Sequence, residues 1–165
     1  MTHPIPPIPG GRQFLRHTLA TLAYRASKAM RGAPSSFSTF IVADGTRTPG
    51  QILAHLGDLM DWALTQAQGQ QRWSDTKPGD WNADVDRFFR SLAALDAYLA
   101  SDAQVHFGAQ KIFQGAIADS LTHVGQINML RRIAAAPVRG ENYARADIAV
   151  GQVTREQPPS RVEFD

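Results

Sequence analysis

The 165-residue sequence contains no cysteine, and this absence removes several kinds of chemistry at once. It excludes disulfide bonds, zinc–thiolate sites and a cysteine nucleophile, so any metal site must use histidine and carboxylate side chains. The chain also lacks an uninterrupted apolar run long enough to cross a membrane, and its start lacks the apolar core of a secretory signal. We therefore expect a cytoplasmic protein with no membrane-spanning segment.

Acidic residues are missing from the first quarter of the chain. Residues 1–43 carry five Lys or Arg and no Asp or Glu, whereas residues 44–165 carry twelve basic and fifteen acidic residues. Such a start is compatible with a transit peptide or a nucleic-acid-binding patch. However, the same segment has an apolar stripe with the spacing of a buried helix face, made of Leu15, Leu19, Leu22, Ala26 and Met30. We interpret it as an integral helix with a solvated basic face, so nucleic-acid binding is not expected.

Apolar periodicity predicts four long helices. They cover residues 11–31, 48–69, 82–101 and 109–136. Thr48, Pro49 and Gln51 have the pattern of an N-cap, a first helical residue and a capping box. A shorter helix is expected over residues 142–150, ending at Gly151. With 43% hydrophobic residues, the chain is expected to be all-α, a four-helix bundle with an additional short C-terminal helix.

One compact domain is expected, with a short extension at each end. We predict a flexible arm over residues 1–10, because the prolines of HPIPPIPGG prevent a helix there. The bundle covers residues 11–153, and the polar, proline-interrupted segment over residues 154–165 is predicted to be an extended tail. The connections over residues 32–47 and 70–81 contain large apolar side chains, so we expect both to pack against the helices.

Asp119 and His123 lie four residues apart in the last predicted helix, and this spacing predicts a shared site. Side chains at positions i and i+4 leave one face of a helix with Cβ atoms ~5–6 Å apart, so they can hold one ion together. Both residues interrupt an apolar row made of Ile112, Ala116, Ile127, Leu130 and Ala134. A carboxylate buried in such a row needs a cation nearby. His55 takes a similar inward position on an earlier helix and completes a candidate metal site. Two simpler roles remain open, a histidine that donates to a backbone carbonyl and a surface Asp–His hydrogen bond.

Three segments, TPGQILAHLGDLMDWAL, IADSLTHVGQINMLRRIAAAP and GENYARADIAVGQV, resemble the DinB/YfiT-like family of small helical metalloenzymes. The resemblance covers the chain from about Phe14 to Val153. In that family a divalent ion lies between helices, held by one His from the second long helix and a His-x-x-x-His pair from the last. The resemblance implies that His55 is the lone ligand and His123 the second member of the pair. Asp119 stands where many relatives have the first histidine of the pair.

The resemblance also implies a function. We expect a metal-dependent enzyme that acts on a small-molecule substrate, with Zn, Ni, Fe or Mn as the ion. Family members include S-transferases and an isomerase that use low-molecular-weight thiols, so a thiol cofactor is expected too.

Pairing among relatives implies a homodimer. The alternatives are a non-catalytic metal- or ligand-binding bundle, a hydrolase and, with least support, a basic nucleic-acid-binding module. A peptidase is not expected, because Ser120 stands where an H-E-x-x-H motif has its Glu.

Other polar and aromatic residues are interpreted from their neighbours. Trp62 and Gln126 are candidate pocket-lining residues, although the same residue types also pack in cores. Asp58, one turn from His55, is interpreted as a solvent-facing acid. Three further histidines are expected to be exposed: His3, His17 and His106.

Overall fold

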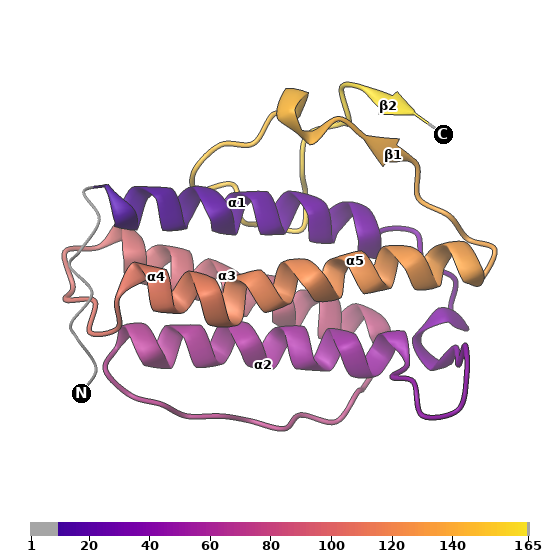
Figure 1. Ribbon diagram of the computed structural model, residues 1–165, viewed down its shortest axis with the longest axis horizontal. Helices are drawn as coiled ribbons and strands as arrows, with labels where there is room; N and C mark the ends of the chain where they lie inside the picture. The colour runs from indigo at the N-terminus through magenta and orange to yellow at the C-terminus, as the bar shows by residue number, and fades with distance from the viewer. Residues whose placement is uncertain (1–9, 165) are drawn as a thin grey trace.

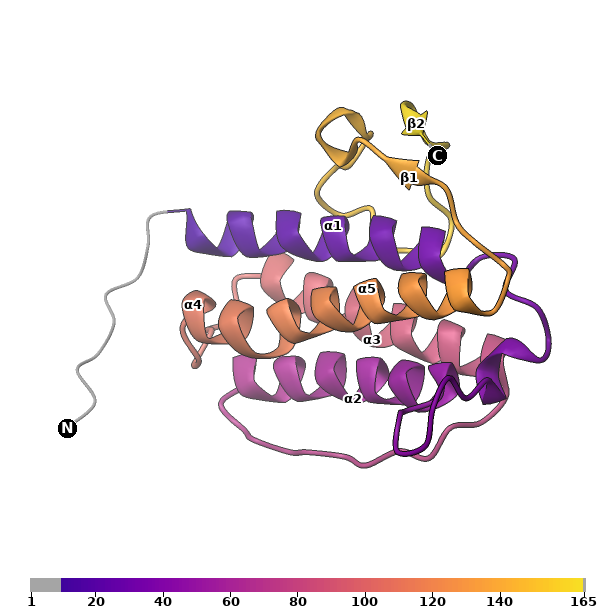
Figure 2. The same cartoon turned by 45° about the vertical axis from the view of Figure 1, so that its right-hand side comes forward.

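Four long helical segments lie side by side in the computed structural model, which describes residues 10–164 (Figure 1). They are α1 (Gly11–Met30), α2 (Pro49–Ala67), α3 (Trp81–Ala100) and a last segment in which α4 (Ala109–Ile112), the π-helical stretch η2 (Phe113–Ile117) and α5 (Ala118–Ile133) follow one another without a break. Figure 2 shows from a second angle that their axes run nearly parallel. The expected mainly helical class is therefore observed. The predicted arm, apart from Gly10, and His3 lie outside the described residues.

Within residues 10–164, the other regular elements are short. They are two 3-10 turns, η1 (Phe37–Thr39) and η3 (Tyr143–Arg145), and two strands, β1 (Gly140–Glu141) and β2 (Glu163–Phe164). The strands pair antiparallel, with Glu141 opposite Glu163. No helix in this part of the chain has both the length and the apolar character that crossing a bilayer requires.

The start of α2 forms as its sequence predicts. The hydroxyl of Thr48 accepts a hydrogen bond from the backbone N–H of Gln51 at 3.2 Å, and the Gln51 side chain accepts one from the backbone N–H of Thr48 at 2.8 Å. This capping box, together with Pro49 in the first turn, satisfies N–H groups that an unfinished helix would leave unpaired. α2 ends at Ala67, and Gly69 turns the chain away with a φ of 80°.

The apolar faces of the helices meet in one core. Every residue of the apolar stripe predicted on α1 is buried, and so is a second stripe on α3 made of Val85, Phe88, Phe89, Leu92, Leu95 and Leu99. α2 packs most extensively against α3, whereas α5 packs against both α1 and α2. Because α2 and α5 are neighbours, His55 faces the helix that carries Asp119 and His123.

The predicted helix over residues 142–150 is wrong. Only η3 forms there, and the side chain of Asn142 accepts a hydrogen bond from Ala144 N–H at 3.2 Å, which closes a tight turn. The chain is extended again at Ala146. The tail explains the difference. Gly140–Glu141 pairs with the tail as a strand, and the backbone N–H of Asn142 donates to the carbonyl of Val162, so no helix begins there. The described part of the tail contributes β2.

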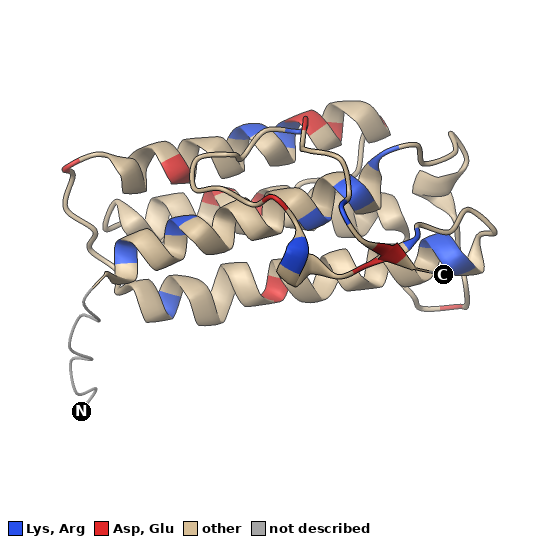
Figure 3. Cartoon of the chain, turned by 90° about the horizontal axis from the view of Figure 1, so that it is seen from above, with Lys and Arg blue, Asp and Glu red and all other residues tan. Residues whose placement is uncertain are grey.

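A buried charge cluster holds this strand pair against α1. We expected the basic residues of α1 to face solvent, and this is wrong for Lys28, whose side chain is only 6% exposed. Its ammonium lies 2.8 Å from a carboxylate oxygen of Glu141 and 2.7 Å from one of Glu163. Tyr24 donates a further hydrogen bond to Glu141 at 2.7 Å. Figure 3, seen from above, shows acidic residues in red beside the C-terminus of the chain.

The ionisation of this cluster follows from its contacts. Burial alone raises the pKa of Glu141, but hydrogen bonds from Lys28 and Tyr24 outweigh that effect and hold the pKa below its ordinary value. Burial, aided by Glu141, raises the pKa of Tyr24 to about 12. The cluster therefore contains a charged Lys–Glu pair and a neutral tyrosine at neutral pH.

The last helix ends earlier than predicted, at Ile133 instead of residue 136, because Ala135 adopts a left-handed conformation with a φ of 56°. We expected Arg131 to lie near the negative end of its own helix. Its guanidinium does reach the carbonyl of Ala136 at 2.7 Å, and it also donates to the carbonyls of Ala29 and Arg31 at 3.1 Å. Arg131 thus joins the end of the last helix to the end of α1.

Candidate metal centre

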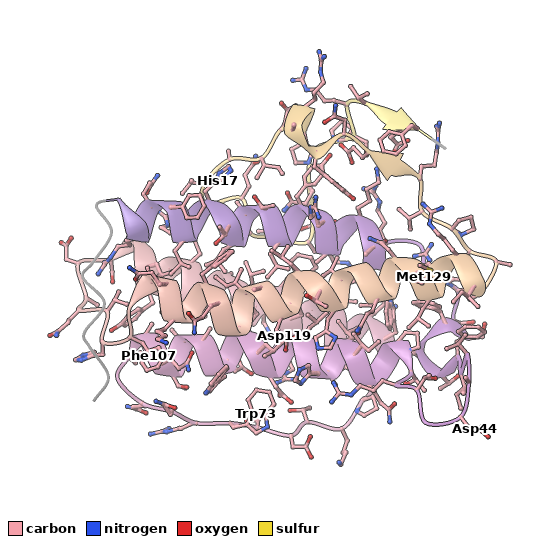
Figure 4. The ribbon with its side chains drawn as sticks, viewed as in Figure 1. His17, Asp44, Trp73, Phe107, Asp119 and Met129 are labelled. Carbon is pink, nitrogen blue, oxygen red and sulfur yellow. The ribbon has the colours of Figure 1, made fainter. Side chains whose placement is uncertain are left out.

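The three predicted ligands meet between α2 and α5. One ring nitrogen of His55, one of His123 and one carboxylate oxygen of Asp119 all lie within 4.8 Å of one another. The two oxygens of Asp119 lie 3.5 Å from Nε2 of His55 and 3.5 Å from Nε2 of His123. Figure 4 shows Asp119 between the two helices. Because donors that bind one ion at ~2.1 Å lie at most ~4.2 Å apart, both Asp–His pairs already have a suitable separation.

The two imidazole rings complete a compact arrangement. The rings of His55 and His123 stand almost perpendicular, at 89°, with their centres 4.9 Å apart. These described residues could therefore hold a divalent ion.

Asp119 is more exposed than we expected. Its side chain is 47% exposed, against 21% for His55 and 11% for His123, because it lies at the edge of the buried face of α5. The expectation that a buried Asp119 requires a cation is therefore wrong. The convergence of three donor atoms is the observation that supports a metal site.

Gln126 fixes the orientation of His123. Its amide oxygen lies 2.7 Å from Nδ1 of His123, one turn away on the same helix. Since an amide oxygen only accepts hydrogen bonds, this contact places the proton on Nδ1 and leaves the lone pair of Nε2 directed toward Asp119. Outer hydrogen bonds of this kind orient ligating histidines and raise their basicity. The prediction that Gln126 lines the pocket is consistent with this position.

Replacing Gln126 with alanine is expected to weaken metal binding by roughly 10–100-fold without unfolding the protein. The side chain is exposed, so its removal costs little packing, but His123 loses the partner that fixes its ring. Titration calorimetry with zinc measures the change. Thr122→Ala is the matched control, since its exposed hydroxyl bonds only to the carbonyl of Ala118. Equal affinities for wild type and Gln126→Ala would show that Gln126 does not position a ligand.

The environment of His55 favours the neutral imidazole that a metal requires. Burial lowers the pKa of His55 below its usual range, and the charges of His123 and Arg47 act in the same direction. Asp119 opposes them without reversing the shift. A neutral ring keeps a nitrogen lone pair for coordination.

The three residues line a cleft of about 690 Å³. Pockets of ~300–1,000 Å³ are typical of small-molecule sites. The apolar part of the wall consists of Val42, Ile52, Met129, Leu130 and Ile133, and the polar part adds Thr46, Arg47 and Gln126. The candidate metal centre is therefore open to a molecule of modest size.

Trp62 lies on the other side of Asp119. It lines a separate hollow of about 450 Å³ together with Gly115 and Asp119, and it is not among the residues of the main cleft. Its ring packs edge-on against Trp73, with centres 5.9 Å apart. The predicted pocket role of Trp62 thus applies to this second hollow.

Sequence reasoning missed Trp73 and Arg47 as residues of the site. The ring centre of Trp73 lies 5.5 Å from that of His55, although Trp73 belongs to the loop after α2 (Figure 4). Arg47 comes just before α2 and lines the main cleft. The apolar content of both connections predicted that they pack on the helices, but it did not identify which side chains reach the ligands.

Asp58 explains how the loop carrying Trp73 is held. We interpreted Asp58 as solvent-facing, and this is wrong: the residue is only 2% exposed. Its carboxylate accepts hydrogen bonds from the backbone N–H and the hydroxyl of Thr76, at 2.9 and 2.7 Å, and pairs with Arg87. Gly57 permits this approach, because a Cβ there would lie 2.7 Å from the Arg87 guanidinium.

The remaining polar candidates have other positions. Ser120 is fully buried, and its hydroxyl donates to the carbonyl of Ala116 at 2.7 Å, so it has no nucleophilic role. His17 and His106 are exposed, as predicted.

In comparisons with protein-family models, curated proteins and solved structures, no match to this chain is found. The DinB/YfiT-like relationship stays a prediction that rests on the sequence segments given above.

Proposed function

We propose that the protein is a metal-dependent enzyme of the DinB-like type, acting on a small molecule as a thiol S-transferase or isomerase. The observation that supports this proposal is the convergence of His55, Asp119 and His123 at the wall of an open cleft. A closed four-ligand site is typical of structural zinc, whereas three protein ligands leave a position for water or substrate. A bound divalent ion would supply Lewis-acid chemistry, lowering the pKa of a bound thiol or water or polarising a carbonyl.

The residues of this chain have separable tasks in the proposal. The two histidines and Asp119 hold the ion, and Gln126 keeps Nε2 of His123 directed at it. Trp73 packs edge-on against His55 and helps to hold its ring in place. The apolar wall of the cleft receives the non-polar part of a substrate. The mixed nitrogen and oxygen donor set suits Zn, Ni, Fe or Mn.

A non-catalytic role is the second candidate, because the ligands come from two helices. An ion held by His55 of α2 and by Asp119 and His123 of α5 would tie these helices together. Both roles predict that metal raises the thermal unfolding temperature. Only the enzyme role predicts that a small thiol or hydroxamate then binds at the ion.

The direct test is the metal content of protein purified without an affinity tag and without nickel resin. We expect close to one divalent ion per chain, measured by elemental analysis. Metal-free protein should regain an ion from micromolar Zn, Ni, Fe or Mn. Protein that neither retains nor regains any of these ions would contradict the proposal.

A homodimer is also proposed. Several large apolar side chains that do not line the cleft are exposed and are available for pairing: Phe14, Ile41 and Phe113. Light scattering over a wide concentration range is expected to give the mass of a dimer. A constant monomer mass would contradict this expectation.

A further inference from the structure

Arg47 is the basic residue of the main cleft. Among the described residues that line this cleft, no other Lys or Arg is present. It lies directly before Thr48, the N-cap of α2, and also lines a smaller hollow that includes His55. Its positive charge therefore lies beside the candidate metal centre.

This charge is not used to hold the fold together. Within residues 10–164, the Arg47 side chain has no ion pair and no hydrogen bond. The contrast with other arginines is clear, since Arg87 pairs with Asp58 and Asp61, and Arg131 donates to backbone carbonyls at two helix ends. An exposed arginine without a partner in a cleft is available to an anionic ligand.

The cleft lining combines this charge and the metal ligands with apolar side chains. Along α2, His55 follows the N-cap Thr48 by seven positions, which corresponds to about 10 Å between their backbones along the helix axis. Ile52 of α2 and Leu130 and Ile133 of α5 are among the apolar residues of this lining. A molecule that spans the cleft needs an anionic end, an apolar middle and a metal-binding end.

We infer that the substrate of this cleft is a small amphiphilic carboxylate. Its carboxylate pairs with the Arg47 guanidinium, its apolar stem packs against Ile52, Leu130 and Ile133, and its opposite end reaches the ion. The inference rests on the proposed metal site. A guanidinium fits a carboxylate through two parallel hydrogen bonds. A doubly charged phosphate is less suited, because the described lining offers only this single cation.

Two hydroxamates that differ only at one end test this inference. Suberic acid monohydroxamate and octanohydroxamic acid bind metal through the same group, but only the first carries a carboxylate at the far end. With zinc-loaded protein, calorimetry is expected to show about tenfold tighter binding of the carboxylate probe, the usual scale for a charged hydrogen bond. Arg47→Gln should remove this preference while keeping the zinc content, and Arg47→Lys should retain part of it.

Arg90→Gln is the matched control, because Arg90 is an exposed arginine of α3 that lines none of the cleft. It should keep the full preference. A wild-type protein that binds zinc and both hydroxamates equally would overturn the carboxylate inference and leave the metal site intact. In metal-free protein, the affinity for octanoate is compared with that for octanamide, which lacks the negative charge. An Arg47-dependent preference for octanoate in a protein that takes up no zinc would support the anion site and overturn the proposed metal function.

Discussion

Replacing Asp119 with alanine is expected to abolish tight metal binding and leave the helical fold intact. The side chain is about half exposed, and within residues 10–164 its ion pairs are with the two histidines, so its removal costs the core no packing. Alanine is also the best helix former. Two histidines remain as ligands. The metal affinity should fall by more than the ~10–100-fold expected when only a hydrogen-bond partner of a ligand is removed. Zinc stoichiometry and affinity measure the result.

Asp119→His is the companion variant, and it should restore binding with a changed preference. An imidazole replaces a hard, charged oxygen donor with a neutral nitrogen, which favours nickel and zinc over manganese. Circular dichroism checks folding, and Asp102→Ala, an exposed acid outside the cleft, serves as the control. If Asp119→Ala binds metal as tightly as the wild type, Asp119 is not a ligand.

Replacing Glu141 with glutamine is expected to lower the free energy of unfolding by about 3 kcal/mol, the scale for breaking a buried ion pair. The Glu141 side chain is fully buried, and its loss leaves Lys28 with Glu163 as its remaining carboxylate partner. Urea unfolding at neutral pH measures the change. Glu156→Gln, an exposed acid in the same tail, should change stability very little.

The effect of Glu141 should also depend on pH. Its pKa is held below the ordinary value in the folded state, so its charge stabilises the fold above the unfolded pKa of about 4.3. This contribution is lost as pH falls through the lower, folded pKa. The stability difference between wild type and Glu141→Gln should therefore shrink in acid. A difference that stays constant from neutral to acidic pH would show that the Glu141 charge does not stabilise the fold.

The sequence predicts those features that depend on nearby residues. The capping box of Thr48 and Gln51 spans one helical turn, and the Asp119–His123 pair spans another. Their geometry follows from helix periodicity alone. His55 is linked to this pair by its inward position on an earlier helix and by the family resemblance, because no local pattern states which helices are neighbours.

Two of the incorrect predictions concern charged residues whose partners are distant in the chain. Asp58 is buried because Arg87 of α3 and Thr76 of a loop reach it. Lys28 is buried because Glu141 lies 113 residues away in sequence but beside it in space. A single acidic or basic residue on a helix gives no local sign of such a partner, so its default interpretation is a solvated side chain.

The π-helical stretch gives the last helical segment one place where its length can change. A π turn accommodates one residue more than an α turn. Deleting one residue from Phe113–Ile117 would therefore leave an α turn and keep the helix that follows in register. A deletion within the regular turns of α5 before His123 would instead rotate the rest of the helix by about 100°. His123 would then turn away from His55, and Val124 and Ile127 would leave the core in the same movement. Selection against unfolding thus also preserves the register of the ligands in α5, whereas a codon loss in the π turn is tolerated.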